Sequence, residues 1–344
     1  MNILVTGANG QLGNCFRRLV NESSDDHYYF ADHKTLDITD KEDVKSTVEQ
    51  FNIDVIINCA AYTNVNGAEV LSDKAFLANT LGPLYLAQTM KEKGGILVHI
   101  STDYVYSPYS WWKGTPFTEE EVVNCKQLNI NGLSKRYGEL AIEKSGCRYL
   151  IIRTSWLYSE YGNNFVKKVI ELIQDTEERP LKFVDDQIGS PTYAGELAEF
   201  INSIIASRDI DKVFQETVNF SDSGVSSWYD FATFIRSKLS EIQKKLFRTI
   251  EPCSSEDLDS PNFPQPKRPS FSVMSKKKLN KLFGPVVLNN WRDNVITVLV
   301  NILANQENEH IGENNTDRFG QRDEKPSGKH GGSTKVDKDR YYGD

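Results

Sequence analysis

Cysteine is scarce in this sequence, and long apolar runs are missing. The 344 residues include five cysteines, which are odd in number, widely spaced and without a CxxC pair. This pattern favours free thiols in a reducing compartment, so we expect a cytoplasmic protein with no disulfide framework and no metal site. No run of about 18 apolar residues occurs, so we expect no membrane span. Because the N-terminus already has the pattern of a strand, we expect no signal peptide.

Basic residues are fewer than acidic ones. The chain carries 40 Lys and Arg against 48 Asp and Glu, which gives a formal net charge of −8 at pH 7. This balance argues against nucleic acid as the main partner, because phosphate backbones attract basic surfaces. Hydrophobic residues make up 39% of the chain, which is enough for a globular core. The length suits one large domain or two that share a core.

The N-terminus has the pattern of a strand, a glycine-rich turn and a helix in direct succession. Residues 1–6 form a short apolar run, glycines follow at Gly7, Gly10 and Gly13, and apolar residues then recur at helical spacing. Gly7 would permit the tight turn, Gly10 would leave room for a phosphate, and Gly13 would let the helix pack closely on the sheet. N–H groups at the helix start would attract an anion. A plain strand–helix turn is the alternative, but the position directly after the first strand favours dinucleotide binding.

Apolar strands and amphipathic helices alternate along most of the chain. The predicted strands after the first cover residues 28–31, 55–63, 96–100, 149–153 and 218–221, and a long helix covers 75–93. This alternation predicts an α/β fold, a doubly wound parallel sheet of the Rossmann type with a smaller C-terminal α+β substrate-binding region. We place the dinucleotide-binding domain at 1–155. The substrate-binding region, part of which returns to the main sheet, is at 156–304, and a disordered polar tail is at 305–344.

Asp32 ends the second predicted strand about 20 residues after the glycine turn, where the adenosine ribose is usually held. A carboxylate there favours NADH over NADPH because it repels a 2′-phosphate, although His33 and Lys34 would weaken that preference. The alternative is a turn aspartate that merely ends a strand. Asp37 follows in the next loop and could reach the adenine edge.

Two further pairs of residues are candidates for the reaction centre. Thr102 and Asp103 follow the fourth predicted strand, and ligands bind at the carboxyl ends of parallel strands. Asn131 and Lys135 lie four residues apart in a predicted helix, so their side chains share one face. The Trp111–Trp112 pair could be an exposed lid or could simply pack against the body of the protein.

These stretches together resemble the dTDP-4-dehydrorhamnose reductases of the extended short-chain dehydrogenase/reductase superfamily, from Met1 to about Ala304. The resemblance is carried by Gly7–Gly13, Asn58–Glu69, Ser101–Tyr106, Gly132–Glu139, Arg153–Phe165, Asp186–Thr192 and Arg268–Ser270. It implies reduction of the C4 ketone of dTDP-4-dehydro-L-rhamnose to dTDP-L-rhamnose with NADPH or NADH. The expected partner is therefore a nucleotide sugar, and a homodimer is one expected assembly.

The resemblance also implies roles for individual residues. Cofactor contacts are expected at Gly7, Gly10, Gln11, Leu12, Gly13, Asp32, Asp37, Ile38, Ala61, Tyr62, Thr63 and Lys135. The sugar nucleotide would meet Thr102, Asp103 and Trp156. Thr102 would hydrogen-bond the C4 oxygen, and Lys135 would hold the nicotinamide ribose and lower the pKa of a neighbouring acid. Trp156 would cover an apolar sugar face, although it could instead be a core aromatic residue.

The sequence departs from the family at the position of the catalytic acid. The family has Tyr-x-x-x-Lys, and its tyrosine donates a proton to the new alkoxide. Here the register of Gly132–Lys135 puts Asn131 in the tyrosine's place. An amide can stabilise developing negative charge by a hydrogen bond, but it cannot deliver a proton. Tyr137 lies on another part of the helix surface, so it is no substitute. An engineered substitution, a natural loss of activity and a rerouted proton all remain open.

Two rival functions follow from this departure. The first is a non-catalytic cofactor-binding or regulatory protein on the same scaffold, as in the regulatory subunits of methionine adenosyltransferase, which resemble this family. The second is an epimerase. Since an epimerase depends even more on an acid–base tyrosine, Asn131 counts against it.

Overall fold

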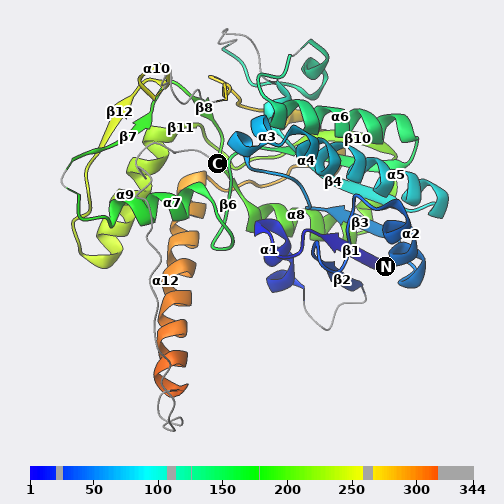
Figure 1. The fold of residues 1–344 in the computed structure, drawn as a ribbon, viewed down its shortest axis with the longest axis horizontal. Helices are drawn as coiled ribbons and strands as arrows, with labels where there is room; N and C mark the ends of the chain where they lie inside the picture. Colours follow the sequence, from blue (N-terminus) through cyan, green and yellow to red (C-terminus); the bar gives the residue numbers. More distant parts are fainter. Residues whose placement is uncertain (21–25, 107–113, 125, 178, 259–265, 317–344) are drawn as a thin grey trace, which may run out of the picture.

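A six-stranded sheet forms the centre of the computed structural model, which describes residues 1–20, 26–106, 114–124, 126–177, 179–258 and 266–316 (Figure 1). Its strands are β1 (Asn2–Thr6), β2 (His27–Ala31), β3 (Val55–Asn58), β4 (Ile96–Thr102), β5 (Arg148–Thr154) and β10 (Gln215–Asn219). They are ordered β10-β5-β4-β3-β1-β2, and every neighbouring pair is parallel. The predicted doubly wound α/β fold is therefore confirmed.

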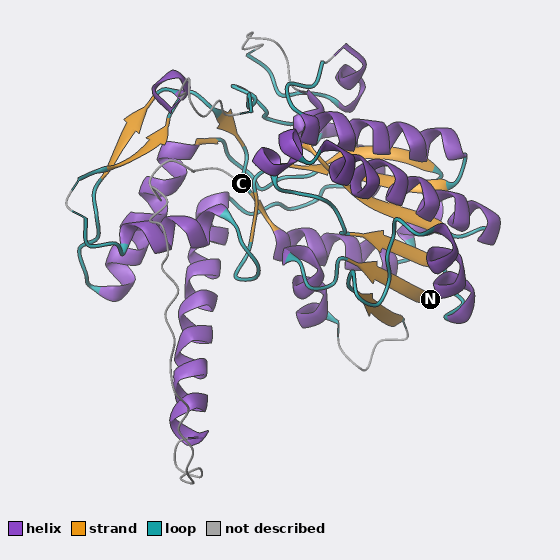
Figure 2. Cartoon of the chain, in the orientation of Figure 1, coloured by secondary structure: helices purple, strands orange, loops and turns teal. Residues whose placement is uncertain are grey.

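Helices cover both faces of this sheet (Figure 2). On one face, Ile3 and Val5 of β1 pack with α1 (Gln11–Leu19) and α8 (Ala194–Ala206). On the other face, Leu4 of β1 packs with helices that follow later strands. These helices are α2 (Lys41–Gln50), α5 (Gly82–Lys93) and α6 (Ile130–Ser145). Burial on both faces explains why the strands are continuous apolar runs rather than alternating ones.

The order of the strands reverses at β1. The chain runs from β1 to β2 at one side and then returns to place β3 at the other side of β1. Doubly wound sheets bind ligands at such a reversal, in the crevice outside the carboxyl ends of the strands. The fold thus brings the segments that follow β1, β3 and β4 to one edge of the sheet.

The segments after β3 differ from their predicted form. The strand predicted at 55–63 ends at Asn58, and residues 59–64 are irregular before α3 (Val65–Val70). The helix predicted at 75–93 is divided into α4 (Ser72–Phe76), a π-helical turn η1 (Leu77–Leu81) and α5. π-turns inside helices are frequent at functional sites, and this one carries a buried asparagine that holds the irregular segment.

A smaller lobe is formed mostly from the second half of the chain and lies to the left of the sheet in Figure 1. Its strands are β6 (Leu157–Tyr158), β7 (Leu181–Val184), β8 (Ile188–Gly189), β9 (Thr192–Tyr193), β11 (Ser226–Ser227) and β12 (Ile250–Cys253). Its helices are α7 (Phe165–Ile173), α9 (Trp228–Gln243), α10 (Ser255–Leu258) and α12 (Trp291–Thr316). Aromatic side chains fill its core, among them Phe165, Phe231 and Trp291. Between α8 and the lobe's α9, β10 returns to the main sheet beside β5.

Four short helices complete the described chain: η2 (Asp103–Tyr106), η3 (Glu119–Asn124), η4 (Asp209–Lys212) and α11 (Lys277–Phe283). The helix α12 continues past Ala304, so the expected tail does not start at residue 305. Its polar extension contains Gln306 and Glu307, which are good helix formers even where nothing packs against them. Residues 317–344 and the Trp111–Trp112 pair lie outside the described residues. None of the described helices combines the length and the apolarity needed to cross a membrane.

Candidate active site

Two glycines in the turn after β1 have no space for a side chain. Gly7 has φ of +63°, and a Cβ atom there would lie 2.7 Å from the backbone nitrogen of Ala60. A Cβ atom at Gly13 would lie 2.6 Å from the Cα atom of Ala8. Gly10 donates its N–H to the Gly7 carbonyl at 2.9 Å, which closes the turn. The turn therefore has the tight geometry that a bound pyrophosphate requires.

The first turn of α1 is open to an anion. Gly10 occupies the cap position and has no side chain to bond the N–H groups, and no acidic residue lies in the first turn. Uncapped N–H groups at a helix start favour a phosphate. The Gln11 side chain is engaged elsewhere, because its Nε2 donates to the Leu157 carbonyl at 3.3 Å and its Oε1 accepts from Ser159. Gln11 thus joins the glycine turn to the smaller lobe.

Asp32 follows β2 and caps the turn that comes after it. Its Oδ1 accepts the backbone N–H groups of Lys34 and Thr35, and the bond from Lys34 is the main cause of its lowered pKa. Its Oδ2 accepts from Asn9 in the glycine turn at 2.6 Å. The carboxylate is therefore a turn cap that also lies beside the predicted cofactor site. Asp37 bonds to Thr39.

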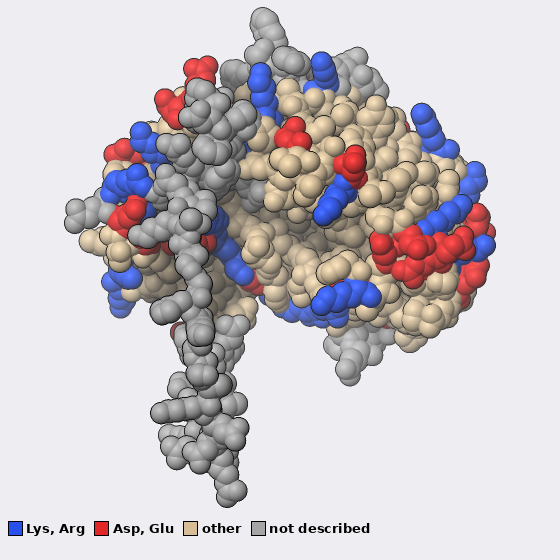
Figure 3. All heavy atoms as spheres, in the orientation of Figure 1, with Lys and Arg blue, Asp and Glu red and all other residues tan. Residues whose placement is uncertain are grey.

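Acidic side chains gather over α2 on the face shown in Figure 3, and α2 begins shortly after Asp37 in the chain. The predicted contact residue Ile38 is buried, and it packs so closely on Gly82 that a Cβ atom there would lie 2.7 Å from Ile38 Cδ1. Negative charge near the expected adenosine end would favour a cofactor without a 2′-phosphate.

The segment after β3 is held by a residue that the sequence analysis did not assign. Asn79 in η1 accepts the Tyr62 N–H at 2.8 Å and donates to the Tyr62 carbonyl at 3.0 Å. It also donates to the Ser134 hydroxyl of α6 at 3.0 Å. Asn79 thereby fixes Ala61, Tyr62 and Thr63 relative to α6. The available signal was a lone asparagine within an otherwise apolar helical pattern.

The start of α6 is fixed on both sides. The Asn129 side chain caps the helix by accepting the Gly132 N–H at 2.8 Å and donates to the Lys267 carbonyl at 2.9 Å. A Cβ atom at Gly132 would lie 2.6 Å from the Tyr104 carbonyl oxygen, so the helix start lies directly against the turn after β4. Asn131 is therefore held next to this turn, and it is 8% exposed.

Lys135 is the buried cation of the site. Its Nζ donates to the Ile100 carbonyl of β4 at 2.5 Å and lies 3.5 Å from His99 Nε2. Burial lowers the pKa of Lys135 to about 8, against the opposing charge of Glu139. A positive charge next to the end of β4 can stabilise an oxygen anion that forms there.

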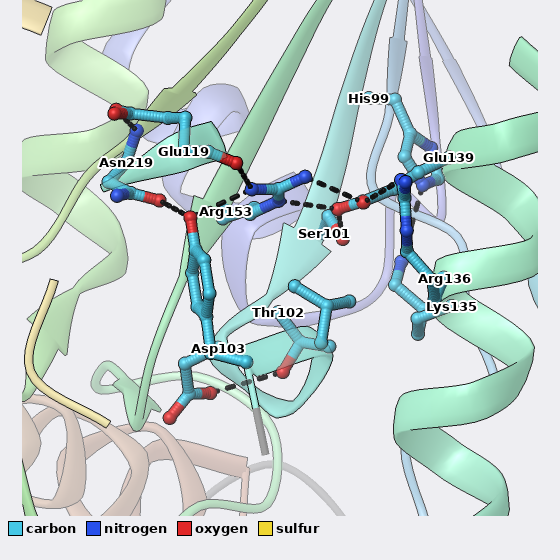
Figure 4. A network of polar contacts seen from close by, with 12 residues as sticks. His99, Ser101, Thr102, Asp103, Glu119, Lys135, Arg136, Glu139, Arg153 and Asn219 are labelled. Carbon is cyan, nitrogen blue, oxygen red and sulfur yellow. Dashed lines mark hydrogen bonds and ion pairs between the residues drawn. The ribbon is translucent and has the colours of Figure 1, made fainter. Parts of the chain in front are cut away.

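The turn after β4 presents Thr102 and Asp103, which lie side by side in Figure 4. Thr102 Oγ1 and Asp103 Oδ1 form a hydrogen bond of 3.1 Å, and Thr102 Oγ1 also accepts the Tyr104 N–H at 3.3 Å. Asp103 is 2% exposed, and its burial raises the carboxyl pKa to about 6. The site therefore holds a carboxyl group that titrates near neutral pH.

A buried ion cluster stabilises the helix and strands behind these residues (Figure 4). Arg153 Nε and Nη2 each donate to the Glu139 carboxylate at 2.9 Å, and the Ser101 hydroxyl donates to it at 2.6 Å. Arg153 Nη1 also donates to the Tyr106 hydroxyl and to the Glu119 carbonyl. The sequence analysis did not find this cluster, because its members lie far apart in the chain.

Trp156 follows β5 in a strained backbone conformation, with φ of +47°. Its ring stacks on Trp228, with centroids 3.6 Å apart and planes inclined by 10°. Its indole edge lies against Gly189, where a Cβ atom would approach to 2.7 Å. Strained residues cluster at functional sites, yet one face of this indole is covered by the lobe's core. The stacking on Trp228 fits the core-aromatic interpretation of Trp156, and its contact with a substrate stays a prediction.

The predicted contacts after successive strands thus lie along the same edge of the sheet. Gly7 follows β1, Asp32 follows β2, Ala61 follows β3, Thr102 ends β4 and Trp156 comes soon after β5. The family model of the RmlD substrate binding domain matches residues 1–304, which include all of these positions. This chain belongs to the RmlD substrate binding domain family.

Named relatives cover most of the chain. A dTDP-4-dehydrorhamnose reductase of Aggregatibacter actinomycetemcomitans is 33% identical over 284 residues, which are 82% of this chain and 93% of that protein. A crystal structure of a dTDP-4-dehydrorhamnose reductase from Clostridium acetobutylicum has a TM-score of 0.77 at 32% identity, and covers 88% of this chain and 100% of that one. The Bacillus anthracis dTDP-4-dehydrorhamnose reductase, solved in complex with NADP, has a TM-score of 0.76 at 33% identity. Its match covers 87% of this chain and 99% of that one.

Tyr137 does not reach the site. It is 50% exposed and packs on the ring of Phe76, with centroids 5.9 Å apart. The Asn131 amide makes no hydrogen bond within the described part of the chain, whereas its backbone carbonyl accepts from Ser134. Asn131 therefore has a polar group to spare for a ligand, but this group is not an acid.

Proposed function

We propose that this chain reduces the C4 ketone of dTDP-4-dehydro-L-rhamnose to dTDP-L-rhamnose with NADPH or NADH. One observation carries the proposal: the uncapped glycine turn, Thr102 and the buried Lys135 lie at the same edge of the sheet. Relatives with this fold over nearly their whole length bear the name of that enzyme, and one of them is a complex with NADP.

The residues present fit a nicotinamide dinucleotide. The glycine turn has no Cβ atom in the space where a pyrophosphate would approach, and the N–H groups of α1 are uncapped. A bound cofactor would supply the hydride to C4 of the sugar. Thr102 would donate a hydrogen bond to the C4 oxygen, and the Lys135 charge and Asn131 amide would stabilise the negative charge that develops there. Trp156 would lie against an apolar face of the sugar.

A coupled assay tests this proposal. NADPH and NADH oxidation would be followed with dTDP-4-keto-6-deoxy sugar, and binding of each cofactor and of dTDP would be measured by calorimetry. We expect cofactor binding and slow reduction of the ketone. Cofactor and sugar-nucleotide binding without any turnover would support the second candidate, a non-catalytic binding or regulatory protein. The amide at Asn131 is the observation that favours this candidate. No binding of either cofactor would refute both.

We further propose a cytoplasmic homodimer. The four cysteines that the structure describes are unpaired, as suits a reducing compartment. Val70, Leu71, Leu77 and Tyr137 are 83%, 42%, 44% and 50% exposed, and they come from neighbouring helices. A second copy that covers this apolar patch would remove these side chains from water. Sedimentation analysis of the chain and of a Val70→Lys, Leu77→Lys variant tests the dimer, and a monomeric parent would refute it.

A further inference from the structure

We propose that Asp103 is the proton donor of the reduction and that it acts through the Thr102 hydroxyl. This inference rests on the proposed function and names the group that replaces the family's tyrosine. The 3.1 Å bond between Thr102 Oγ1 and Asp103 Oδ1 is the contact that would carry the proton, and Figure 4 shows the two side chains together after β4.

The second oxygen of Asp103 makes the carboxyl group unusual. Oδ2 is fully enclosed and forms no hydrogen bond within the described chain, although the Ser272 hydroxyl lies close enough to the group to affect its pKa. Oδ1 accepts from Thr102, but the donors around the group do not offset the desolvation cost of a charge on this buried carboxylate. Binding a proton removes that cost. The environment of Asp103 therefore favours the acid that a reduction needs.

The charged groups on the elements packed against this turn are engaged elsewhere. On α6, Lys135 donates to the Ile100 carbonyl, and Arg136 bonds to Glu139 and Glu143. On η3, the Glu119 carboxylate accepts the Asn219 N–H. In the segment that precedes Ser272, the Arg268 guanidinium contacts Asn66.

Burial is accordingly the largest influence on the Asp103 pKa, and it raises this pKa to about 6. Hydrogen bonds from Ser272, from Thr102 and from nearby backbone N–H groups oppose the rise. A group with this pKa is partly protonated near neutral pH and can be protonated again from water after each turnover.

Hydride and proton would reach the ketone in one step. As hydride reaches C4, the C4 oxygen becomes an alkoxide and takes the proton of the Thr102 hydroxyl. Thr102 Oγ1 takes the proton of the Asp103 carboxyl group in the same movement, so Thr102 is unchanged and Asp103 becomes a carboxylate. The cofactor is oxidised and the sugar ketone is reduced to an alcohol. Solvent then returns a proton to Asp103.

The experiment uses Asp103→Asn, which keeps the size of the side chain and removes its proton. We expect kcat to fall by about 10²-fold or more, which lies in the range of general acid catalysis. Unchanged cofactor affinity would show that the variant is folded. In the parent, kcat should fall as pH rises above about 6, in proportion to the protonated fraction. Ser272→Ala removes a hydrogen bond that lowers the pKa, so it should move this fall to higher pH.

Two further measurements separate the relay from a structural role. In an Asn131→Tyr background the phenol supplies the proton, so Asp103→Asn should cost less than about threefold in kcat. Infrared difference spectra of the parent should contain a protonated carboxyl band that titrates near pH 6 and is missing from Asp103→Asn.

Each contrary result has a distinct meaning. A parent without any turnover overturns the proposed function, and the relay with it. A parent that turns over, with a rate unaffected by Asp103→Asn or with no fall between pH 5 and 8, overturns the relay alone and points to Lys135 as the donor. If Asp103→Asn lowers kcat equally in the parent and in the Asn131→Tyr variant, Asp103 positions the substrate and does not supply the proton.

Discussion

Replacing Arg153 with methionine should destabilise the fold severely. Arg153 is 2% exposed, and its guanidinium donates four hydrogen bonds: two to Glu139, one to the Tyr106 hydroxyl and one to the Glu119 carbonyl. Methionine keeps most of the length and apolar volume but leaves the fully buried Glu139 carboxylate without its main partner. Breaking a buried pair in this way costs about 3–5 kcal/mol, because an uncompensated charge remains inside.

The structure places the expected loss at the lower end of that range. Arg136 Nη1 also contacts the Glu139 carboxylate at 2.9 Å, so some positive charge remains after the substitution. We therefore expect a loss of about 3 kcal/mol, or roughly 4–5 °C in melting temperature. Arg136→Met is the matched control. It contacts the same carboxylate from a side chain that is 13% exposed, and it should cost about 1 kcal/mol or less.

The pH dependence of the loss gives a second check. Burial alone would raise the pKa of Glu139, but the charge and hydrogen bonds of Arg153 keep it below its usual value. In the parent this lowered pKa contributes stability at neutral pH that is lost as pH falls through the folded-state pKa. In Arg153→Met the folded-state pKa of Glu139 should rise above its unfolded value, so the variant loses stability as pH rises. The deficit should therefore be smaller at pH 4 than at pH 8.

Urea unfolding and calorimetry of the parent, Arg153→Met and Arg136→Met at both pH values would measure these differences. The double variant Arg153→Met with Glu139→Gln should recover most of the loss, because it removes the stranded charge. A loss below about 1 kcal/mol for Arg153→Met, or a deficit that grows at low pH, would refute the assignment of this cluster as a buried ion pair.

Three further outcomes are expected at the site. Asn131→Tyr puts a phenol one turn before Lys135 and should raise kcat at least about tenfold with little change in KM. An unchanged kcat would show that a phenol at position 131 does not supply the proton. Gly10→Val should abolish NADH and NADPH binding in calorimetry by filling the space for the pyrophosphate, and retained binding would contradict the assignment of the turn. Asp32→Ala should shift the ratio of affinities towards NADPH by removing a negative charge, and a constant ratio would leave Asp32 as a turn cap only.

The fold was predictable because its signals are local. The glycine spacing at residues 7–13 and the continuous apolar strands are each readable within a few residues, and they predicted the turn and the parallel sheet. The end of α12 was not predictable in this way, because the loss of apolar residues after Ala304 indicates an end of packing rather than an end of helix. Helix propensity alone can continue a helix there.

The polar contacts behind the site were not predictable from the sequence. Arg153 and Glu139 are 14 positions apart, and the Glu119 carboxylate meets the Asn219 N–H across 100 positions. Each of these residues is unremarkable in its own segment, since Lys, Arg and Glu are usually solvated. Only the pairing of strands and helices in space brings them together. The composition of a single segment therefore carries no signal for them.

A second set of buried hydrogen bonds determines whether the charge of Lys135 is paired with His99. The Ala60 N–H donates to Asn58 Oδ1 at 3.2 Å, which turns the Asn58 amide nitrogen towards His99 Nδ1 at 3.0 Å. His99 Nδ1 is then an acceptor, so the ring proton lies on Nε2, which faces Lys135. Burial, and then the charge of Lys135, keep the pKa of His99 well below its usual value, so the ring stays neutral. Because Nε2 of the neutral His99 ring carries a proton, it cannot accept a hydrogen bond from Lys135. The Lys135 ammonium group is therefore not paired with His99. It remains available to an anion at the end of β4, where Thr102 and Asp103 lie.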